Sequence, residues 1–406
     1  MLRELIEYSR LKPLLQNNKT LCVLCVSAVN QCLFYLRPLR LKIIYESNNM
    51  KRRDFIKKAG ISGVAAAGIA APAIATAKTK LKWKMVTTWP KNFPVLGTGA
   101  NQLAEAITEM TDGRIKVKVY GAGELVPAFE VFDAVSRGTA EMGHGAAYYW
   151  KGKIEEAQFF STVPFGMNSQ EMNAWLYHGG GMQLWEQTYA PFGVLPAAAG
   201  NTNVQMAGWF NKEINSVNDL NGLKMRIPGL GGEVLKRAGG TPVNLPGGEL
   251  FTSLKTGAID ATEWVGPYND LAFGLYKAAK YYYYPGWHEP GTTLEALINK
   301  KAYDALGKDL QSIVRNACKM VNQEMSTEFT AKNNAALDTL VNKHKVDVRK
   351  LPDDVLVKLK ALSEEVVSEL AGTNPAASKI YSSYDKFRKQ VMAWHDISEK
   401  IYYNVR

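Results

Sequence analysis

Strand-like and helix-like patterns alternate along the chain between residues 81 and 290. Leu81–Trp89 and Arg114–Tyr120 alternate apolar and polar residues as strands do, and Gly97–Thr111 between them has the spacing of an amphipathic helix. Short apolar stretches followed by glycine turns and helical segments repeat this order further along the chain. The pattern predicts parallel strands joined by crossover helices, and therefore an α/β fold.

The remaining elements of this region follow the same logic. Strands are expected over Glu141–Trp150, Val194–Ala199, Gln205–Phe210, Lys224–Pro228, Pro242–Leu245, Ile259–Val265 and Tyr281–Trp287, and helices over Pro127–Ser136, Glu233–Ala238, Gly248–Thr256 and after Pro267. No candidate linker separates two contiguous halves of the chain. Two sheets joined by crossing strands would explain that absence.

The chain is mostly helical from Lys300 onward, and its last predicted helix, about Pro375 to Tyr403, is long for a globular fold. Its apolar positions are Ile380, Tyr381, Tyr384, Phe387, Val391, Met392, Trp394, Ile397 and Ile401. This broad apolar face fits two interpretations, packing across both lobes of its own chain or dimerisation.

The segment 50–77 resembles a secretion signal. The basic stretch Met50–Lys58 precedes an alanine- and glycine-rich apolar run, and Ala75–Ala77 fits a small-x-small cleavage pattern. Arg52 and Arg53 fit a twin-arginine export motif. The apolar run is short and rich in glycine, which disfavours the alternative of an uncleaved membrane anchor. Residues 1–49 are interpreted as a start-site artefact or an unstructured leader, with Met50 as the natural start.

Most of the excess positive charge and all cysteines except Cys318 lie in this N-terminal part of the sequence. The net charge of +11 is concentrated there, because residues 1–77 carry 12 Lys and Arg against 4 Asp and Glu, and the remainder carries 37 against 34. The body has no interleaved basic and aromatic stripe, so we expect no nucleic-acid partner. Cys318 is the only cysteine after residue 49, which excludes an internal disulfide in the body.

Searches for catalytic motifs find none. The sequence lacks H-E-x-x-H, the phosphate-binding G-x-x-x-x-G-K-[ST] and the nucleophile pattern G-x-S-x-G. The five histidines show no metal-ligand spacing, and each is interpreted as structural. Gly229–Gly232 is an incomplete dinucleotide fingerprint, but glycines between a strand and a helix can expose backbone N–H groups to an anion.

Arg226 is the first candidate binding residue, because it ends the predicted strand Lys224–Pro228, and ligands of α/β sheets bind at strand ends. A guanidinium there is costly unless it meets an anion, and its planar fork suits a carboxylate. The alternative is a salt bridge or a solvated edge.

Glu263 and Trp264 close another predicted strand and form a second candidate. A glutamate beside an anion site would repel the ligand unless a cation bridged the two, and oxygen ligands favour Na⁺ or Ca²⁺ over zinc. Pairing of Glu263 with a lysine is the alternative. The tyrosine run Tyr281–Tyr284 is more typical of core packing, but Trp287 and Glu289 after it can reach the same cleft.

At these residues the chain resembles the solute-binding proteins of tripartite ATP-independent periplasmic (TRAP) transporters, and in particular the branch that binds 2-oxo acids or lactate with a metal. The matching stretches are Thr88–Pro90, Gly200–Thr202, Gln205–Phe210, Met225–Gly229, Leu245–Glu249, Gly257–Ala261 and Glu263–Tyr268. Together they span roughly residues 80–290, and their order is more specific than any single motif.

The resemblance implies a periplasmic receptor with two α/β lobes that close over a ligand around a hinge. One lobe would comprise about residues 78–201 with part of 290–330, and the other about 202–289 with later helices. It implies that Arg226 clamps the carboxylate. The further residues implied are Tyr149 as a hydrogen-bond donor to the ligand, Gln205 as a contact of both ligand and cation, and Glu263, the Trp264 carbonyl and Glu289 as cation ligands.

The expected partners are a small 2-oxo or 2-hydroxy monocarboxylate, the membrane subunits of the transporter and a second copy of the chain, bound through the long C-terminal helix. A receptor for a sugar acid or a dicarboxylate is the first alternative, although it would want a second cationic residue in the cleft. A periplasmic metal-dependent enzyme, with His288 as its acid or base, and a sensory partner of a membrane kinase are the others.

Overall fold

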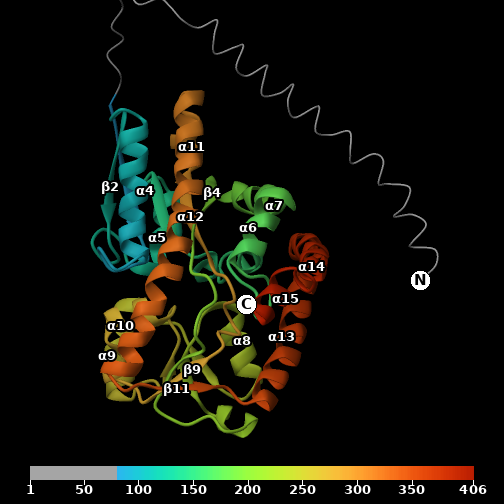
Figure 1. Cartoon of the computed structure of the whole chain (residues 1–406). Helices are drawn as coiled ribbons and strands as arrows, with labels where there is room; N and C mark the ends of the chain where they lie inside the picture. Colours follow the sequence, from blue (N-terminus) through green and yellow to red (C-terminus); the bar gives the residue numbers. More distant parts are fainter. Residues whose placement is uncertain (1–79) are drawn as a thin grey trace, which may run out of the picture. The chain divides into compact units, whose positions relative to one another are not determined.

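The computed structural model describes residues 80–406, which fold around two β-sheets (Figure 1). The predicted export signal over 50–77, its arginine pair and the segment 1–49 lie outside the described residues. Within the described part, no helix combines the length and the apolar character needed to cross a membrane.

The first sheet has five strands in the order β2-β1-β3-β10-β4. They are β1 (Leu81–Thr87), β2 (Ile115–Tyr120), β3 (Met142–Gly145), β4 (Val194–Asn201) and β10 (Thr293–Asn299). β1 pairs in parallel with β2 and β3, whereas β10 runs antiparallel to β3 and β4. The parallel strands β1 and β2 are joined through helix α4 (Leu96–Met110), as the sequence predicts.

The second sheet has six strands in the order β11-β9-β5-β8-β6-β7. They are β5 (Gly208–Phe210), β6 (Lys224–Arg226), β7 (Thr241–Val243), β8 (Ala261–Thr262), β9 (Tyr281–Tyr284) and β11 (Asp347–Lys350). β6 pairs in parallel with β7 and β8, so the ends of β6 and β8 meet at one edge. This places the residues that follow β8 beside the last residue of β6.

Three chain segments connect the sheets, and two of them, between β4 and β5 and between β9 and β10, lie side by side; the third runs from β10 through α12 to β11. The backbones of the first two are joined by hydrogen bonds from Thr202 N to Thr292 O (3.0 Å), from Gln205 N to Glu289 O (3.2 Å) and from Gly286 N to Gln205 O (2.9 Å). The expected two-lobed α/β fold with a hinge is therefore confirmed, and the hinge consists of the segments 202–207 and 285–292.

Helices cover both sheets. They are α5 (Val131–Ser136), α6 (Ser169–His178), α7 (Gly181–Tyr189), α8 (Gly229–Arg237), α9 (Leu250–Thr256), α10 (Pro267–Phe273), α11 (Lys300–Asp304), α12 (Lys308–Asp338), α13 (Asp353–Thr373), α14 (Pro375–His395) and α15 (Glu399–Val405). The long α12 packs on β4 and α4 of the first sheet and on α10 of the second (Figure 1). α13 packs on α8, and α14 packs on α6 and α7, so the C-terminal region also contacts both lobes.

Several predicted elements have different bounds in the structure, and three of these differences affect the site. The strand predicted over Glu141–Trp150 ends at Gly145, and a 3₁₀ turn, Ala147–Trp150, carries its aromatic residues. The strand predicted over Ile259–Val265 is reduced to the two residues of β8, because the chain turns at Glu263 toward the space between the lobes. α8 begins at Gly229 instead of Glu233 and so includes the glycines.

Those glycines give α8 its close approach to the hinge. A Cβ on Gly231 would lie 3.0 Å from the Cβ of His288, and one on Gly229 would lie 3.1 Å from the Cβ of Tyr148. Gly229 also has a left-handed backbone with φ of 62°.

The long C-terminal helix is present, but it is divided. α14 ends at His395, three residues follow, and α15 completes the chain to Val405. Ile380 and Tyr384 are buried against the protein's own core, whereas Trp394 is 58% and Ile397 73% exposed. The first half of the apolar face therefore packs within the chain, and the second half faces outward.

Candidate functional site

A small cavity lies between the two lobes beside the hinge, and the space in it and at its opening to solvent amounts to about 240 Å³. Its lining comes from both sheets and from the hinge: Trp89, Leu96, Tyr148, Tyr149, Thr202, Gln205, Arg226, Trp264, Val265 and Leu294. Most of these side chains are apolar or aromatic, and Arg226 is the only Lys or Arg among them. Such a cavity suits a small ligand with one anionic end.

Arg226 is the last residue of β6 and is 1% exposed. Its guanidinium forms an ion pair with Glu263, and it donates hydrogen bonds to the Tyr149 hydroxyl (3.2 Å) and the Leu245 carbonyl (3.0 Å). The Trp264 ring lies 5.2 Å from its central carbon. Burial opposes its charge, but the field of Glu263 and the neighbouring tyrosines leaves the pKa of Arg226 above its ordinary value.

Glu263 is fully buried next to Arg226, and the alternative that it pairs with a lysine is wrong. Only one of its carboxylate oxygens, Oε1, is engaged by the guanidinium. The other, Oε2, has no hydrogen-bond partner and lies 3.6 Å from Nε2 of His288. Strand β8 and the hinge therefore bring a carboxylate and an imidazole together behind Arg226.

Gln205 and Glu289 face each other across the two hinge segments. The amide nitrogen of Gln205 donates to Oε2 of Glu289 (2.7 Å) and to the Thr202 hydroxyl (3.0 Å), and Thr292 donates to the same carboxylate oxygen. This bonding turns the amide oxygen of Gln205 away from Glu289, and that oxygen has no partner.

Burial and the field of Glu263 raise the pKa of Glu289 to about 8. Two carboxylates in one buried site resist being ionised together unless a positive charge joins them. Arg226 supplies one such charge, and a bound cation would supply another.

The acceptors at the site fit a cation. Oε1 of Gln205 and Oε2 of Glu263 are buried without a hydrogen-bond partner, and leaving such groups unpaired is costly. One donor atom each of Glu263, His288 and Glu289 lie within 4.8 Å of one another. A cation placed among the atoms of Glu263, His288 and Glu289 would give the free oxygen of Glu263 a partner and lie between the two carboxylate charges.

An aromatic wall forms the rest of the cavity. Trp89 lies edge-on to Trp264 with ring centroids 6.3 Å apart, and Tyr148 lies edge-on to Tyr149 at 4.8 Å. The Trp89 indole donates to Nδ1 of His144 (2.7 Å), whose Nε2 lies 3.0 Å from the Ala199 carbonyl. Burial lowers the pKa of His144 to about 4, so the ring is neutral and holds Trp89 in place.

The two lobes also touch at the mouth of the cavity. Phe93 of the first lobe stacks on Phe273 of α10 at 4.1 Å, and the Asn269 side chain donates to the Pro94 carbonyl (3.0 Å). Val95 beside them has φ of 60°, which is unusual for a β-branched residue. The loop that presents Phe93 therefore has a constrained shape, and these contacts close the lobes over the cavity.

Four of the six site residues predicted from the sequence line the cavity, and the other two, Glu263 and Glu289, contact Arg226 and Gln205 of that lining. Arg226, Glu263 and Trp264 come from the second lobe, Tyr149 from the first, and Gln205 and Glu289 from the hinge. From the sequence, His288 is interpreted as structural, or as the acid or base of the alternative enzyme, and no role is assigned to Tyr148, Thr202 and Trp89. Adjacency to Glu289 was the one sequence signal that pointed to His288.

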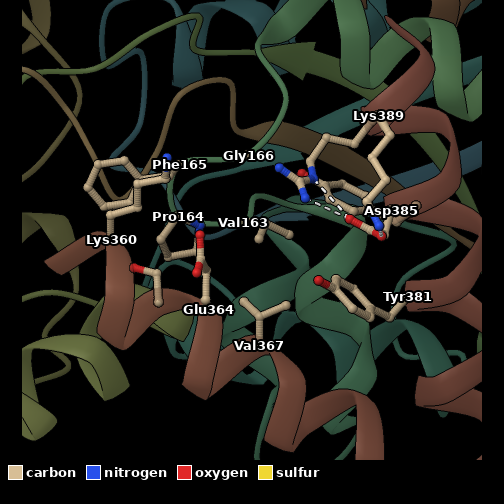
Figure 2. A pocket seen from close by; sticks show the side chains of 13 residues that line it. Val163, Pro164, Phe165, Gly166, Lys360, Glu364, Val367, Tyr381, Asp385 and Lys389 are labelled. Carbon is tan, nitrogen blue, oxygen red and sulfur yellow. Dashed lines mark hydrogen bonds and ion pairs between the residues drawn. The ribbon is translucent and has the colours of Figure 1, made fainter. Parts of the chain in front are cut away.

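A second hollow lies between α13, α14 and the loop Val163–Gly166, and encloses about 690 Å³ (Figure 2). Three of its charged groups are paired with one another, because Asp385 accepts from Arg388 (2.7 Å) and pairs with Lys389 (2.6 Å). The buried Ser363 hydroxyl donates to the Leu359 carbonyl (2.7 Å). None of the sequence-predicted site residues lines it.

Comparison with known proteins identifies the family. Residues 85–373 match the family model DctP, described as bacterial extracellular solute-binding protein, family 7. A monocarboxylate 2-oxoacid-binding periplasmic protein of Nostoc sp. is 43% identical over 364 residues, which cover 87% of this chain and 98% of the relative.

Two solved structures share the fold. A TRAP periplasmic solute-binding protein of Pseudoalteromonas atlantica with bound sodium and pyruvate is 43% identical, with a TM-score of 0.78, and the match covers 80% of this chain and 99% of that one. A TRAP transporter solute-binding protein of Bordetella bronchiseptica, a mixed-occupancy dimer with calcium and picolinate, is 36% identical, with a TM-score of 0.79, and the match covers 80% and 97%. The fold, the site between the lobes and these matches lead to one conclusion: this chain belongs to the DctP family of TRAP transporter solute-binding proteins.

Proposed function

We propose that this receptor binds a small 2-oxo or 2-hydroxy monocarboxylate, such as pyruvate or lactate, together with Na⁺ or Ca²⁺ in the cavity between its lobes. The observation that carries the proposal is the pairing of one buried arginine with buried acceptors that have no partner, in Gln205 and Glu263. The arginine supplies a carboxylate site, and the acceptors supply a cation site beside it.

Pyruvate and picolinate, the ligands of the two related structures, share one chemical feature. Each carries a carboxylate with a second donor atom on the adjacent carbon, so each can chelate a cation in a five-membered ring. This shared feature supports a bridging cation over a purely arginine-bound ligand.

In the proposed complex, Arg226 and the Tyr149 hydroxyl hold the ligand carboxylate. Gln205, Glu263, the Trp264 carbonyl and Glu289 hold the cation. Ligand binding then requires Arg226 to share its donors between Glu263 and the carboxylate. The cation makes this sharing favourable, because it replaces the positive charge that Glu263 loses.

The lining favours a monocarboxylate over the alternatives. A dicarboxylate or an extended sugar acid would bring a second anionic or polar end against the wall formed by Trp89, Leu96 and Leu294, where no second Lys or Arg lies. The cost of burying an unpaired charge would exclude such ligands. The same wall sets the length of side chain that fits.

We further propose that the role is transport and not catalysis. Both buried carboxylates of the site are held by neighbours, since Glu263 pairs with Arg226 and Glu289 accepts from Gln205 and Thr292. These are binding contacts. The twin-arginine signal over 50–77 would deliver the receptor, residues 78–406, to the periplasm, where it would hand its cargo to TRAP membrane subunits.

The exposed apolar residues of α14 and α15 support a homodimer. Met392, Trp394, Ile397, Ile401, Tyr402, Tyr403 and Val405 are all exposed in the single chain. Exposed apolar residues gathered in one short segment are typical of an interaction surface, and one related protein is a dimer. Light scattering of the wild type against a Trp394→Ser/Ile397→Ser variant tests this, and a monomeric wild type at 100 μM would refute it.

Calorimetric titration of residues 78–406 tests the ligand. Pyruvate, lactate and a longer 2-oxo acid are titrated with 10 mM Na⁺, with 1 mM Ca²⁺ and with EDTA in potassium buffer. We expect submillimolar binding of at least one acid that weakens at least tenfold without Na⁺ and Ca²⁺. Binding of none of these acids, with succinate or a sugar acid bound instead, would overturn the assignment.

A further inference from the structure

His288 is a buried imidazole that the proposed binding mode leaves unexplained. It lies in the hinge segment between β9 and β10 and is 1% exposed. Neither of its ring nitrogens has a hydrogen-bond partner within residues 80–406. Buried polar side chains are nearly always paired, so two free nitrogens on one buried ring require a reason.

The surroundings hold the ring in one place. Its Cβ lies against Gly231 of α8, where a Cβ would come within 3.0 Å, and its ring lies edge-on to Trp287 at 5.5 Å. The backbone is fixed on both sides, by the hydrogen bond from Phe165 N to Trp287 O (2.8 Å) and by that from Glu289 N to Gly286 O (3.2 Å). The imidazole is therefore preorganised.

The ring lies beside two carboxylates. Its Nε2 lies 3.6 Å from the unpartnered Oε2 of Glu263, too far for a hydrogen bond. One donor atom from each of Glu263, His288 and Glu289 lies within 4.8 Å of the other two. Ligands about 2.0–2.3 Å from a zinc-sized ion are at most about 4.6 Å apart, so small movements bring all three onto one ion.

We propose that His288 is a nitrogen ligand of the cation site, which makes the site competent for a borderline divalent cation such as Zn²⁺ or Co²⁺ as well as for Na⁺ or Ca²⁺. The inference rests on the proposed function, because Glu263 and Glu289 serve both kinds of cation. Na⁺ and Ca²⁺ take oxygen ligands, whereas imidazole suits Zn²⁺ and its neighbours. An all-oxygen site needs no imidazole, and here one lies between the two carboxylates.

Co²⁺ serves as the test probe because its visible absorption reports its ligands. Apo-protein of residues 78–406 is titrated with Co²⁺ alone, as wild type, His288→Phe and His288→Gln. His344→Asn is the matched control, since that half-buried histidine stacks on Tyr276 at 4.0 Å, outside the cavity lining. We expect a d–d band in the wild type and the control, and at least tenfold weaker Co²⁺ binding with an altered band in both His288 variants.

Calcium provides the second readout. Because Ca²⁺ needs only the oxygens, its affinity in the presence of pyruvate should change less than fivefold in His288→Gln. Equal Co²⁺ affinity and band in wild type and His288→Gln would overturn the inference. An equal fall in the affinities for Co²⁺ and Ca²⁺ in a folded His288→Gln variant would also overturn it, because it would indicate a structural role for His288.

The two proposals fail in different ways. If the wild type binds Co²⁺ through His288 but no carboxylate with Na⁺ or Ca²⁺, the ligand assignment fails and the histidine ligand stands. If the His288 variants do not fold, electron spin-echo modulation of one equivalent of Cu²⁺ replaces them, in a His178→Asn/His344→Asn/His395→Gln variant that also removes the histidine beside Glu171 and Glu399. Modulation from a remote imidazole nitrogen is expected, and its absence would overturn the inference.

Discussion

Two hollows in the described part of this protein, the groove at α13 and α14 and the cavity at the hinge, differ in how many of their polar groups have partners. The groove at α13 and α14 is the larger, about 690 Å³ against about 240 Å³, yet its carboxylate Asp385 is already paired with two cationic side chains. The cavity at the hinge is small, and it contains buried acceptors without partners. Folding has paired Asp385 of the groove with two cations and has left buried acceptors at the hinge to be satisfied by a ligand.

The difference teaches that unpaired buried polar atoms identify a binding site better than volume does. A surface groove lined by mutually paired charges gains little by exchanging those partners for a solute. A buried acceptor without a partner carries a cost of about 1–3 kcal/mol, which a correctly placed cation removes. The free energy of binding is therefore expected at the smaller hollow.

The largest expected effect on pyruvate binding comes from replacing one arginine in each hollow and comparing the two losses. Arg226→Ala should weaken pyruvate binding by about 30-fold to several thousand-fold, because breaking a buried charge pair costs about 2–5 kcal/mol. Arg388→Ala, in the second groove, should change it less than twofold. Calorimetry measures both, and Arg226→Lys guards against misfolding. A stronger effect at Arg388 than at Arg226 would reverse the comparison.

The pH dependence of cation binding probes the hinge cavity next. Glu289 has a pKa raised to about 8, and its ionised form is the one that holds a cation. Cation affinity should therefore rise with pH up to about 8, by up to about tenfold per pH unit. Below that pH, cation binding should make the protein release a proton to the buffer. Glu289→Gln should remove the pH dependence of cation affinity and lower that affinity. A flat profile in the wild type between pH 6 and 8 would contradict this.

Glu295 tests whether an unpaired buried acceptor always means a ligand. Its Oε2 has no partner, but Oε1 accepts from Trp150 (2.5 Å) and it lines neither hollow. Burial raises the pKa of Glu295 to about 8. Above about pH 4.5 the unfolded chain loses this proton while the folded chain keeps it, so stability should fall as pH rises and level off above 8.

Denaturant unfolding at pH 6 and pH 9 measures this loss, on the order of a few kcal/mol. Glu295→Gln should unfold with a smaller difference between the two pH values and bind pyruvate as the wild type does. A variant as pH-sensitive as the wild type would show that other groups cause the loss. At this position the cost of the unpaired oxygen would appear as stability and not as affinity.

The smallest expected effect is at the mouth. Phe93→Ala removes the stack on Phe273 that closes the lobes, and an aromatic pair is worth about 0.5–1.5 kcal/mol beyond its buried area. Pyruvate affinity should fall about two- to tenfold, mainly through faster dissociation in stopped-flow fluorescence. Phe273→Leu, which keeps the volume, should have a smaller effect. An unchanged dissociation rate would show that these contacts do not hold the closed form.

The local sequence pattern was sufficient to predict elements whose periodicity can be read from adjacent residues. The alternation of Leu81–Thr87 and Ile115–Tyr120 and the helix between them were predicted within a residue or two, because periodicity reports a buried face directly. It was insufficient where the chain leaves a sheet. The predicted strand over Ile259–Val265 fails after Thr262, since nothing in an apolar run records that its partner strand β6 ends at Arg226.

The sequence by itself determined the α/β class, the two-sheet organisation and, through its resemblance to a known family, the six residues that meet at the cavity. Only the tertiary structure decided how they are paired. Arg226 forms an ion pair with Glu263, and Gln205 donates a hydrogen bond to Glu289. A donor atom of His288 lies near both carboxylates. The physical reason is that residue type sets what a group can bind, whereas partner and burial depend on which distant segments fold beside it. Gln205 and His288 are 83 residues apart in the chain, and only the hinge brings them together.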